Sequence, residues 1–116
     1  MQTEDLEWAA AVRATSAHRR SLGPEAIVEL GRQNDALMAE VQHVLDDDPA
    51  SPAVQAIAVR WATLVREMNG PAVPLETLLR CGRATYRDAL RRKPELAASP
   101  WGRAISLLGR AAALRL

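Results

Sequence analysis

The chain has 116 residues, a length typical of one compact domain that buries roughly two thirds of its unfolded surface. Its formal net charge is +1, and its arginines are interleaved with aspartate and glutamate, so no basic block indicates direct contact with nucleic acid. A lone cysteine excludes an intrachain disulfide, and without a signal-peptide pattern or an apolar run of membrane-spanning length we expect a cytoplasmic protein that contacts no membrane.

Helical periodicity begins near the N-terminus, and the first two predicted helices meet at a glycine. The first helix is expected over residues 4–19, with Thr3 as its N-cap and only a thin apolar stripe. A helix with so little apolar surface has low local stability. After a break at Gly23, a proline suits the first position of a second helix, expected over residues 24–45.

The third predicted helix has the strongest local signals at both ends. An acidic run and a proline turn precede Ser51, a good N-cap residue, and Pro52 suits the first helical position. Apolar residues then recur at helical spacing as far as Met68. Gly70 is suited to a left-handed cap, and the proline that follows it cannot continue the helix.

The last two predicted helices are separated by a second proline-rich joint. The fourth helix is expected to begin at Pro74 and to end in a basic segment before Pro94. Gly82 lies in its middle and costs about 1 kcal/mol relative to alanine unless a neighbour approaches closely there. Ser99 repeats the capping signal, and a fifth helix is expected over residues 101–114. No alternating strand pattern competes, so the sequence predicts an all-α, single-domain bundle of about five helices.

Few residues are suited to catalysis or to metal binding. His18 and His43 have no second histidine or cysteine at a ligand spacing, and no phosphate-binding loop or nucleophile motif occurs. We therefore expect a protein that is not an enzyme and that holds no metal and no cofactor.

Cys81 permits two interpretations. Flanking Arg80 and Arg83 are expected to lower the pKa of its thiol, which would make the residue a candidate for covalent attachment of a ligand. The alternative, which we favour, is that a single cysteine on a helix behaves as a small buried hydrophobic residue.

Aromatic residues make up only 3% of the chain, so each position carries information. Trp61, Tyr86 and Trp101 lie on three different predicted helices and are candidates for the walls of one apolar cavity. The simpler interpretation of Trp61 is a place in the core, because it continues the apolar stripe of its helix.

Residues 23–116 resemble the antibiotic-recognition domain of the TipA type, found in MerR-type transcription regulators and in stand-alone drug-binding proteins such as albicidin-binding proteins. The resemblance depends on dipeptides and a tetrapeptide at the family's spacing: Asp48-Pro49, Ser51-Pro52, Val54-Gln55 and Ala58-Val59-Arg60-Trp61. It implies an all-helical, globin-related domain that binds large, mostly apolar antibiotics between helices. It also implies mobile N-terminal helices, here residues 1–22, that close over residues 23–116.

The leading hypothesis is a ligand-binding module for a large apolar drug-like or peptide-like antibiotic, either as the effector domain of a transcription regulator or as a sequestering resistance protein. The alternative is a helical protein–protein interaction or homodimerisation domain that uses the same surface. The residues assigned to ligand binding are Gln55, Arg60, Trp61, Leu64, Met68, Leu78, Tyr86 and Trp101.

Overall fold

The computed structural model describes the backbone of residues 3–115 and the side chains of residues 6–114. Within these residues it contains five α-helices, one 3-10 helix and no strand, which confirms the predicted all-α class. The elements in chain order are α1 (Thr3–Leu22), α2 (Pro24–Val41), α3 (Pro52–Asn69), α4 (Leu75–Arg92), η1 (Pro94–Ala98) and α5 (Pro100–Arg115). No helix in this part of the chain combines the length and the apolar composition needed to cross a bilayer.

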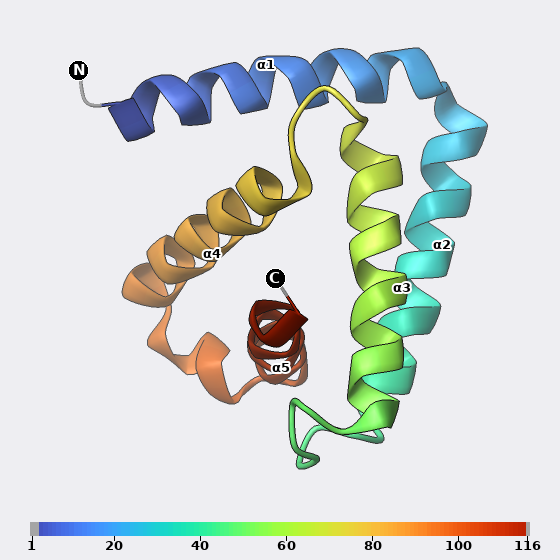
Figure 1. The fold of residues 1–116 in the computed structure, drawn as a ribbon, viewed down its shortest axis with the longest axis vertical. Coiled ribbons are helices and arrows are strands. Elements are labelled where there is room, and N and C mark those ends of the chain that lie inside the picture. The colour runs from blue at the N-terminus through green and yellow to red at the C-terminus, as the bar shows by residue number, and fades with distance from the viewer. Residues whose placement is uncertain (1–2, 116) are drawn as a thin grey trace.

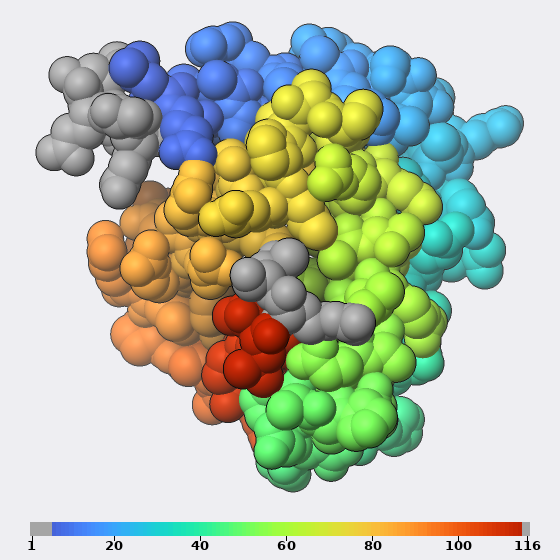
Figure 2. Space-filling model, in the orientation of Figure 1, coloured from blue at the N-terminus to red at the C-terminus, as the bar shows by residue number. Residues whose placement is uncertain are grey.

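Helix α3 is the centre of the bundle and contacts each of the other four α-helices. Helix α2 runs antiparallel beside it, and α5 lies between α3 and α4 (Figure 1). Helix α1 lies across the end of the bundle at which α2 begins and α3 ends (Figure 1). On the face shown in Figure 2, side chains of the α3–α4 connection and of the first turns of α4 fill the space beside α1.

The main hydrophobic core is built from α2, α3 and α5 alone. Its buried members are Leu30, Leu37, Val41, Val54, Ile57, Ala58, Leu64, Ala104, Leu107, Leu108 and Ala111. Among the described side chains, α1 and α4 each bury one residue, Ala11 and Leu79, and both lie outside this cluster. Burial of apolar surface is the dominant favourable term in folding, so α1 and α4 contribute less to stability than the other three helices.

The capping signals in the sequence act as predicted at two helix starts. The Ser51 hydroxyl accepts a hydrogen bond from the Val54 N–H at 3.4 Å, and the Ser99 hydroxyl accepts one from the Gly102 N–H at 3.0 Å. In both cases a proline follows in the first helical position, where its missing N–H leaves no unpaired donor.

Two helix ends lie three or four residues from those expected, and one short helix was not predicted. Helix α1 continues to Leu22, so the break is confined to Gly23. Helix α2 ends at Val41, four residues earlier than predicted, because the chain turns there and packs Val44 against the core from outside the helix. The short helix η1 was not predicted; its 3-10 hydrogen bonds, such as that from the Ser99 N–H to the Leu96 carbonyl at 3.1 Å, arise where Pro94 prevents α4 from continuing.

Helix α4 buries little of its apolar surface. Leu79 is its only buried residue, and Gly82 is exposed. A Cβ atom added to Gly82 would meet no atom within 4 Å outside its own helix backbone and its chain neighbours, so no close approach explains the glycine.

A candidate ligand-binding cavity between three helices

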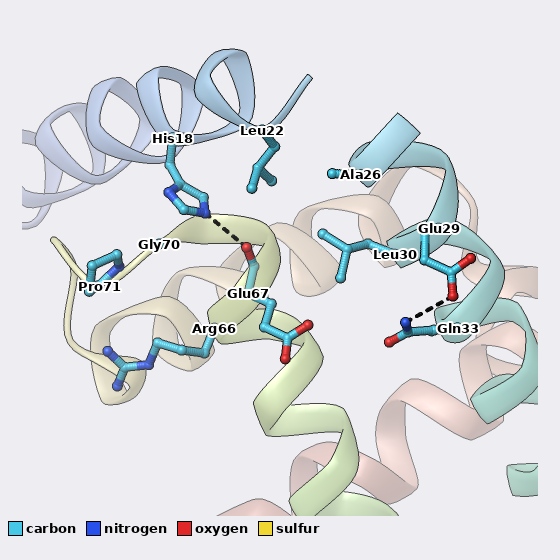
Figure 3. Close-up of a pocket in the computed structure, with 10 residues that line it drawn as sticks. All are labelled: His18, Leu22, Ala26, Glu29, Leu30, Gln33, Arg66, Glu67, Gly70 and Pro71. Atoms are coloured by element: carbon cyan, nitrogen blue, oxygen red, sulfur yellow. Dashed lines mark hydrogen bonds between the residues drawn. The ribbon is translucent and has the colours of Figure 1, made fainter. Parts of the chain in front are cut away.

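A cavity of about 560 Å³ lies in the angle between α1, α2 and α3. Figure 3 shows that the last turns of α1, the first turns of α2 and the end of α3 all contribute side chains to it. The lining residues are His18, Leu22, Ala26, Glu29, Leu30, Gln33, Arg66, Glu67, Gly70 and Pro71. Cavities that bind drug-sized molecules have volumes of about 300–1,000 Å³, so this one is large enough.

One wall of the cavity is apolar because small and large aliphatic residues recur every four positions. Leu22, Ala26 and Leu30 follow one another at this spacing across the joint between α1 and α2. Leu30 is buried, whereas Leu22 and Ala26 are half-buried. Leu22 and Leu30 also border a second, smaller cavity of about 130 Å³, whose other lining residues are Arg19, Ile27 and Met68.

Helix α1 is attached at this site through the end of α3. The His18 Nε2–H donates to the Glu67 carbonyl at 2.9 Å, and the Arg19 Nε–H donates to the Met68 carbonyl at 3.4 Å. Arg19 also donates from Nη2 to Asn69 Oδ1 at 2.9 Å. The last carbonyls of a helix have no partner within it and carry partial negative charge, so donors from another segment are favourable there.

Two glycines make the turns that form the cavity. Gly23, between α1 and α2, has φ 81° and ψ 164°, and Gly70, which ends α3, has φ 85° and ψ 171°. The predicted positive φ at Gly70 is confirmed, but its ψ is extended instead of left-handed helical, a combination that only glycine adopts readily. A Cβ atom on Gly70 would lie 2.6 Å from His18 Cγ, so the missing side chain also lets α1 approach α3.

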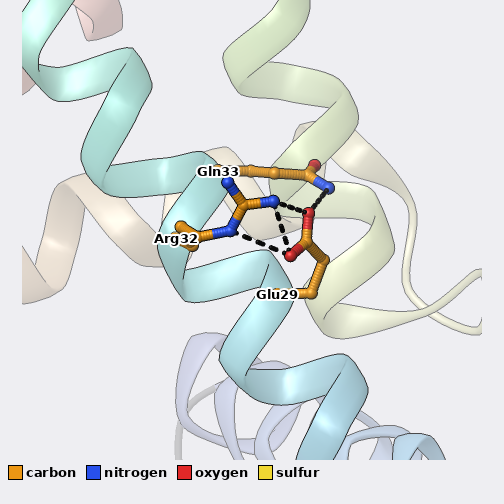
Figure 4. Close-up of polar contacts among 3 residues, drawn as sticks. All are labelled: Glu29, Arg32 and Gln33. Carbon is orange, nitrogen blue, oxygen red and sulfur yellow. Dashed lines mark hydrogen bonds and ion pairs between the residues drawn. The ribbon is translucent and has the colours of Figure 1, made fainter.

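The rim contributed by α2 is polar and negatively charged. The Glu29 carboxylate accepts hydrogen bonds from Arg32 Nη2 at 2.6 and 2.7 Å, from Arg32 Nε at 3.0 Å, and from Gln33 Nε2 at 3.1 Å (Figure 4). The hydrogen bonds from Arg32, followed by the one from Gln33, lower the pKa of Glu29 below its usual value. Glu29 is therefore ionised at neutral pH and already has a cationic partner.

The aromatic residues predicted to share one cavity are not brought together by the structure. Trp61 is half-buried and packs against the core, and neither of the two cavities is lined by it. Tyr86 and Trp101 do meet, edge to face, with ring centroids 5.7 Å apart, and the Tyr86 hydroxyl donates to the Gly102 carbonyl at 3.1 Å. The Trp101 side chain remains 48% exposed, so this pair forms part of the surface.

Of the remaining residues assigned to ligand binding, only Met68 borders either cavity. The Gln55 amide donates to the Pro49 carbonyl at 2.8 Å and the Ala111 carbonyl at 3.0 Å, which joins α3 to α5. Arg60 makes a bidentate ion pair with Glu40 on the surface, at 2.6 and 2.9 Å. Leu64 is a core residue, and Leu78 is half-buried on α4.

The less favoured interpretation of Cys81, a thiol activated by its flanking arginines, is wrong in the direction of the pKa shift. The residue is partly buried, and this desolvation, together with the nearby Glu7 carboxylate, raises the pKa of the thiol, while Arg80 opposes the rise. The Arg80 guanidinium is hydrogen-bonded to Glu7, so its positive charge is largely matched by that carboxylate.

Sequence reasoning missed most of the cavity residues. His18 was noted only as an isolated histidine, and no residue that lines the larger cavity was assigned to ligand binding. The available signal was the spacing of four in Leu22, Ala26 and Leu30, on both sides of a glycine joint.

Among the described residues, no group of three or more histidine, cysteine, aspartate or glutamate side chains is arranged to hold a metal ion.

A family model, the TipAS antibiotic-recognition domain, matches residues 3–92 of the chain. The matched region contains α1 to α4 and therefore every residue that lines the two cavities. No curated protein and no solved structure matches the chain.

Proposed function

Because the chain belongs to the TipAS antibiotic-recognition domain family, we propose that the cavity between α1, α2 and α3 binds a large, mostly apolar antibiotic or drug-like molecule. The observation that carries this proposal is an apolar wall in an open cavity of about 560 Å³ within the matched region. Transfer of an apolar ligand from water to this wall contributes roughly 25 cal/mol for each Å² of apolar surface removed from water.

The attachment of α1 supports its role as a movable wall. Its bonds to α3 are exposed hydrogen bonds from His18 and Arg19, and it supplies no residue to the buried core cluster. Displacement of α1 would remove the contact of Leu22 with this cluster but leave its buried members in α2, α3 and α5 packed against one another. On this proposal residues 1–22 open to admit a ligand and close over it.

Under this proposal the protein binds its ligand and catalyses no reaction. Two biological roles use such binding: sequestration of an antibiotic by a stand-alone resistance protein, and detection of it by the effector domain of a MerR-type transcription regulator. Both roles need the same cavity, and neither needs contact between this domain and DNA.

Filling the cavity tests the proposal directly. Ala26→Trp places an indole ring in the apolar wall, whereas Ala39→Trp makes the same change at an exposed position of the same helix that borders neither cavity. A panel of peptide and polyaromatic antibiotics is titrated into each protein by isothermal titration calorimetry. We expect saturable binding to the parent chain and to Ala39→Trp, and loss of binding in Ala26→Trp.

Equal binding by both variants would place the ligand elsewhere and refute the assignment of the cavity. Absence of binding across the panel, combined with concentration-dependent sedimentation of the parent chain, would favour a self-association domain instead.

A further inference from the structure

The charged and polar groups of the cavity are not evenly distributed. In Figure 3 the Glu67 carboxylate points into the gap between α3 and α2, and Arg66 extends the other way, toward Pro71. Gln33 faces the same gap from α2 (Figure 3). The anionic side of the cavity therefore lies between α2 and α3, and its cationic side lies near the turn that ends α3.

The groups on the α2–α3 side offer more hydrogen-bond acceptors than free donors. Gln33 donates one of its two Nε2–H groups to Glu29, and its carbonyl oxygen accepts no hydrogen bond within the described residues. Among the side chains that the structure describes, none forms an ion pair or a hydrogen bond with the Glu67 carboxylate. Helix α2 adds a wider negative field, because it carries four carboxylates and one arginine, a net charge of −3.

A ligand that fills the cavity covers these acceptors and removes part of their hydration. An ionised carboxylate that loses water without gaining a partner costs free energy, and an unpaired amide oxygen costs less but still opposes binding. A ligand with a positive N–H group at this position supplies the missing donor and forms a charge-assisted hydrogen bond. A neutral ligand of the same shape can donate a hydrogen bond but brings no positive charge to the carboxylate, and an anionic ligand is repelled by it.

We propose that the ligand of this cavity is an amphipathic cation, whose protonated amine or guanidinium binds between the Glu67 carboxylate and the Gln33 side-chain carbonyl. Its apolar body lies on Leu22, Ala26 and Leu30. This inference rests on the proposed function, since it assigns a chemical class to the ligand of the same cavity.

Three fluorescent probes with one apolar body test the inference: 1-pyrenemethylammonium, 1-pyrenemethanol and 1-pyreneacetate. Each is titrated into the parent chain at neutral pH and low salt, with pyrene emission as the readout. We expect the ammonium probe to bind about fivefold more tightly than the alcohol, the ratio that one partly exposed charge-assisted contact supplies, and the acetate to bind most weakly.

Glu67→Gln tests whether the Glu67 carboxylate causes the preference for the ammonium probe, and Glu95→Gln is its control. Both substitutions remove one negative charge from an exposed side chain, but Glu95 lies on η1, outside the cavity. We expect Glu67→Gln to bring the affinities for the ammonium and alcohol probes close to equal, and Glu95→Gln to preserve the difference between them.

The outcomes separate this inference from the proposed function. If all three probes bind equally and Ala26→Trp abolishes their binding, the cavity binds ligands but the inference of a cation is overturned. A preference for the ammonium probe that survives Glu67→Gln overturns it as well. If no probe binds the parent chain, the proposed function fails together with the inference.

Discussion

Replacement of Gly70 by alanine tests whether the close approach of α1 to α3 forms the cavity. Gly70 has φ 85°, and Gly23 has φ 81° with a similar extended ψ, so both backbones lie in a region that essentially only glycine adopts. Alanine at either position therefore costs about 1–3 kcal/mol in backbone strain. Gly23→Ala is the matched control, because its added Cβ would have no atom within 4 Å.

The two substitutions differ in what the new methyl group meets. At Gly70 it would lie 2.6 Å from Cγ and 3.0 Å from Cβ of His18. Rotation about the Cα–Cβ bond of His18 can move Cγ away, whereas Cβ moves only if α1 moves. The hydrogen bond from His18 to the Glu67 carbonyl is then lost, at a cost of about 1 kcal/mol. We expect Gly70→Ala to lower the free energy of unfolding by at least about 1 kcal/mol more than Gly23→Ala does.

Urea unfolding, followed by far-ultraviolet circular dichroism, measures the loss of unfolding free energy in each variant. If the unfolding free energy of each variant falls with urea concentration at the same slope as that of the parent chain, the two losses can be compared directly. Limited trypsin digestion under native conditions adds a local readout, since arginines of α1 should become accessible faster in Gly70→Ala than in Gly23→Ala. Equal losses of stability with equal cleavage rates would contradict the role assigned to the contact between His18 and Gly70.

Two further predictions concern α4 and its neighbours. Gly82→Ala should raise the free energy of unfolding by roughly 0.5–1 kcal/mol, because it removes the entropic cost of glycine from an open helical site. Urea unfolding measures this change, and a loss of stability would reveal a contact at this position. Cys81 should react with iodoacetamide at neutral pH more slowly than a fully exposed thiol, because its raised pKa reduces the thiolate fraction. Glu7→Gln should accelerate this reaction, and an unchanged rate would exclude the Glu7 carboxylate as a cause of the raised pKa.

Local signals in the amino-acid sequence were sufficient to predict the helical class and most helix ends. Ser51 and Ser99 cap helices through hydrogen bonds to N–H groups three residues away, and Gly70 ends α3 at a positive φ. Interactions of this range depend on neighbouring residues alone, so they can be recognised before the fold is known. The early end of α2 was missed because no glycine, asparagine or proline marks it in the sequence.

The cavity could not be predicted in the same way, because the contact that forms it joins residues 49 positions apart, His18 and Glu67. Periodicity showed that Trp61, Tyr86 and Trp101 lie on separate helices but carried no information on the angles between those helices. In the folded chain α3 directs Trp61 toward the core, while Trp101 contacts Tyr86 edge to face at the surface. Helix–helix geometry depends on which ridges and grooves meet across the whole bundle, so only the tertiary arrangement decides which side chains surround a common space.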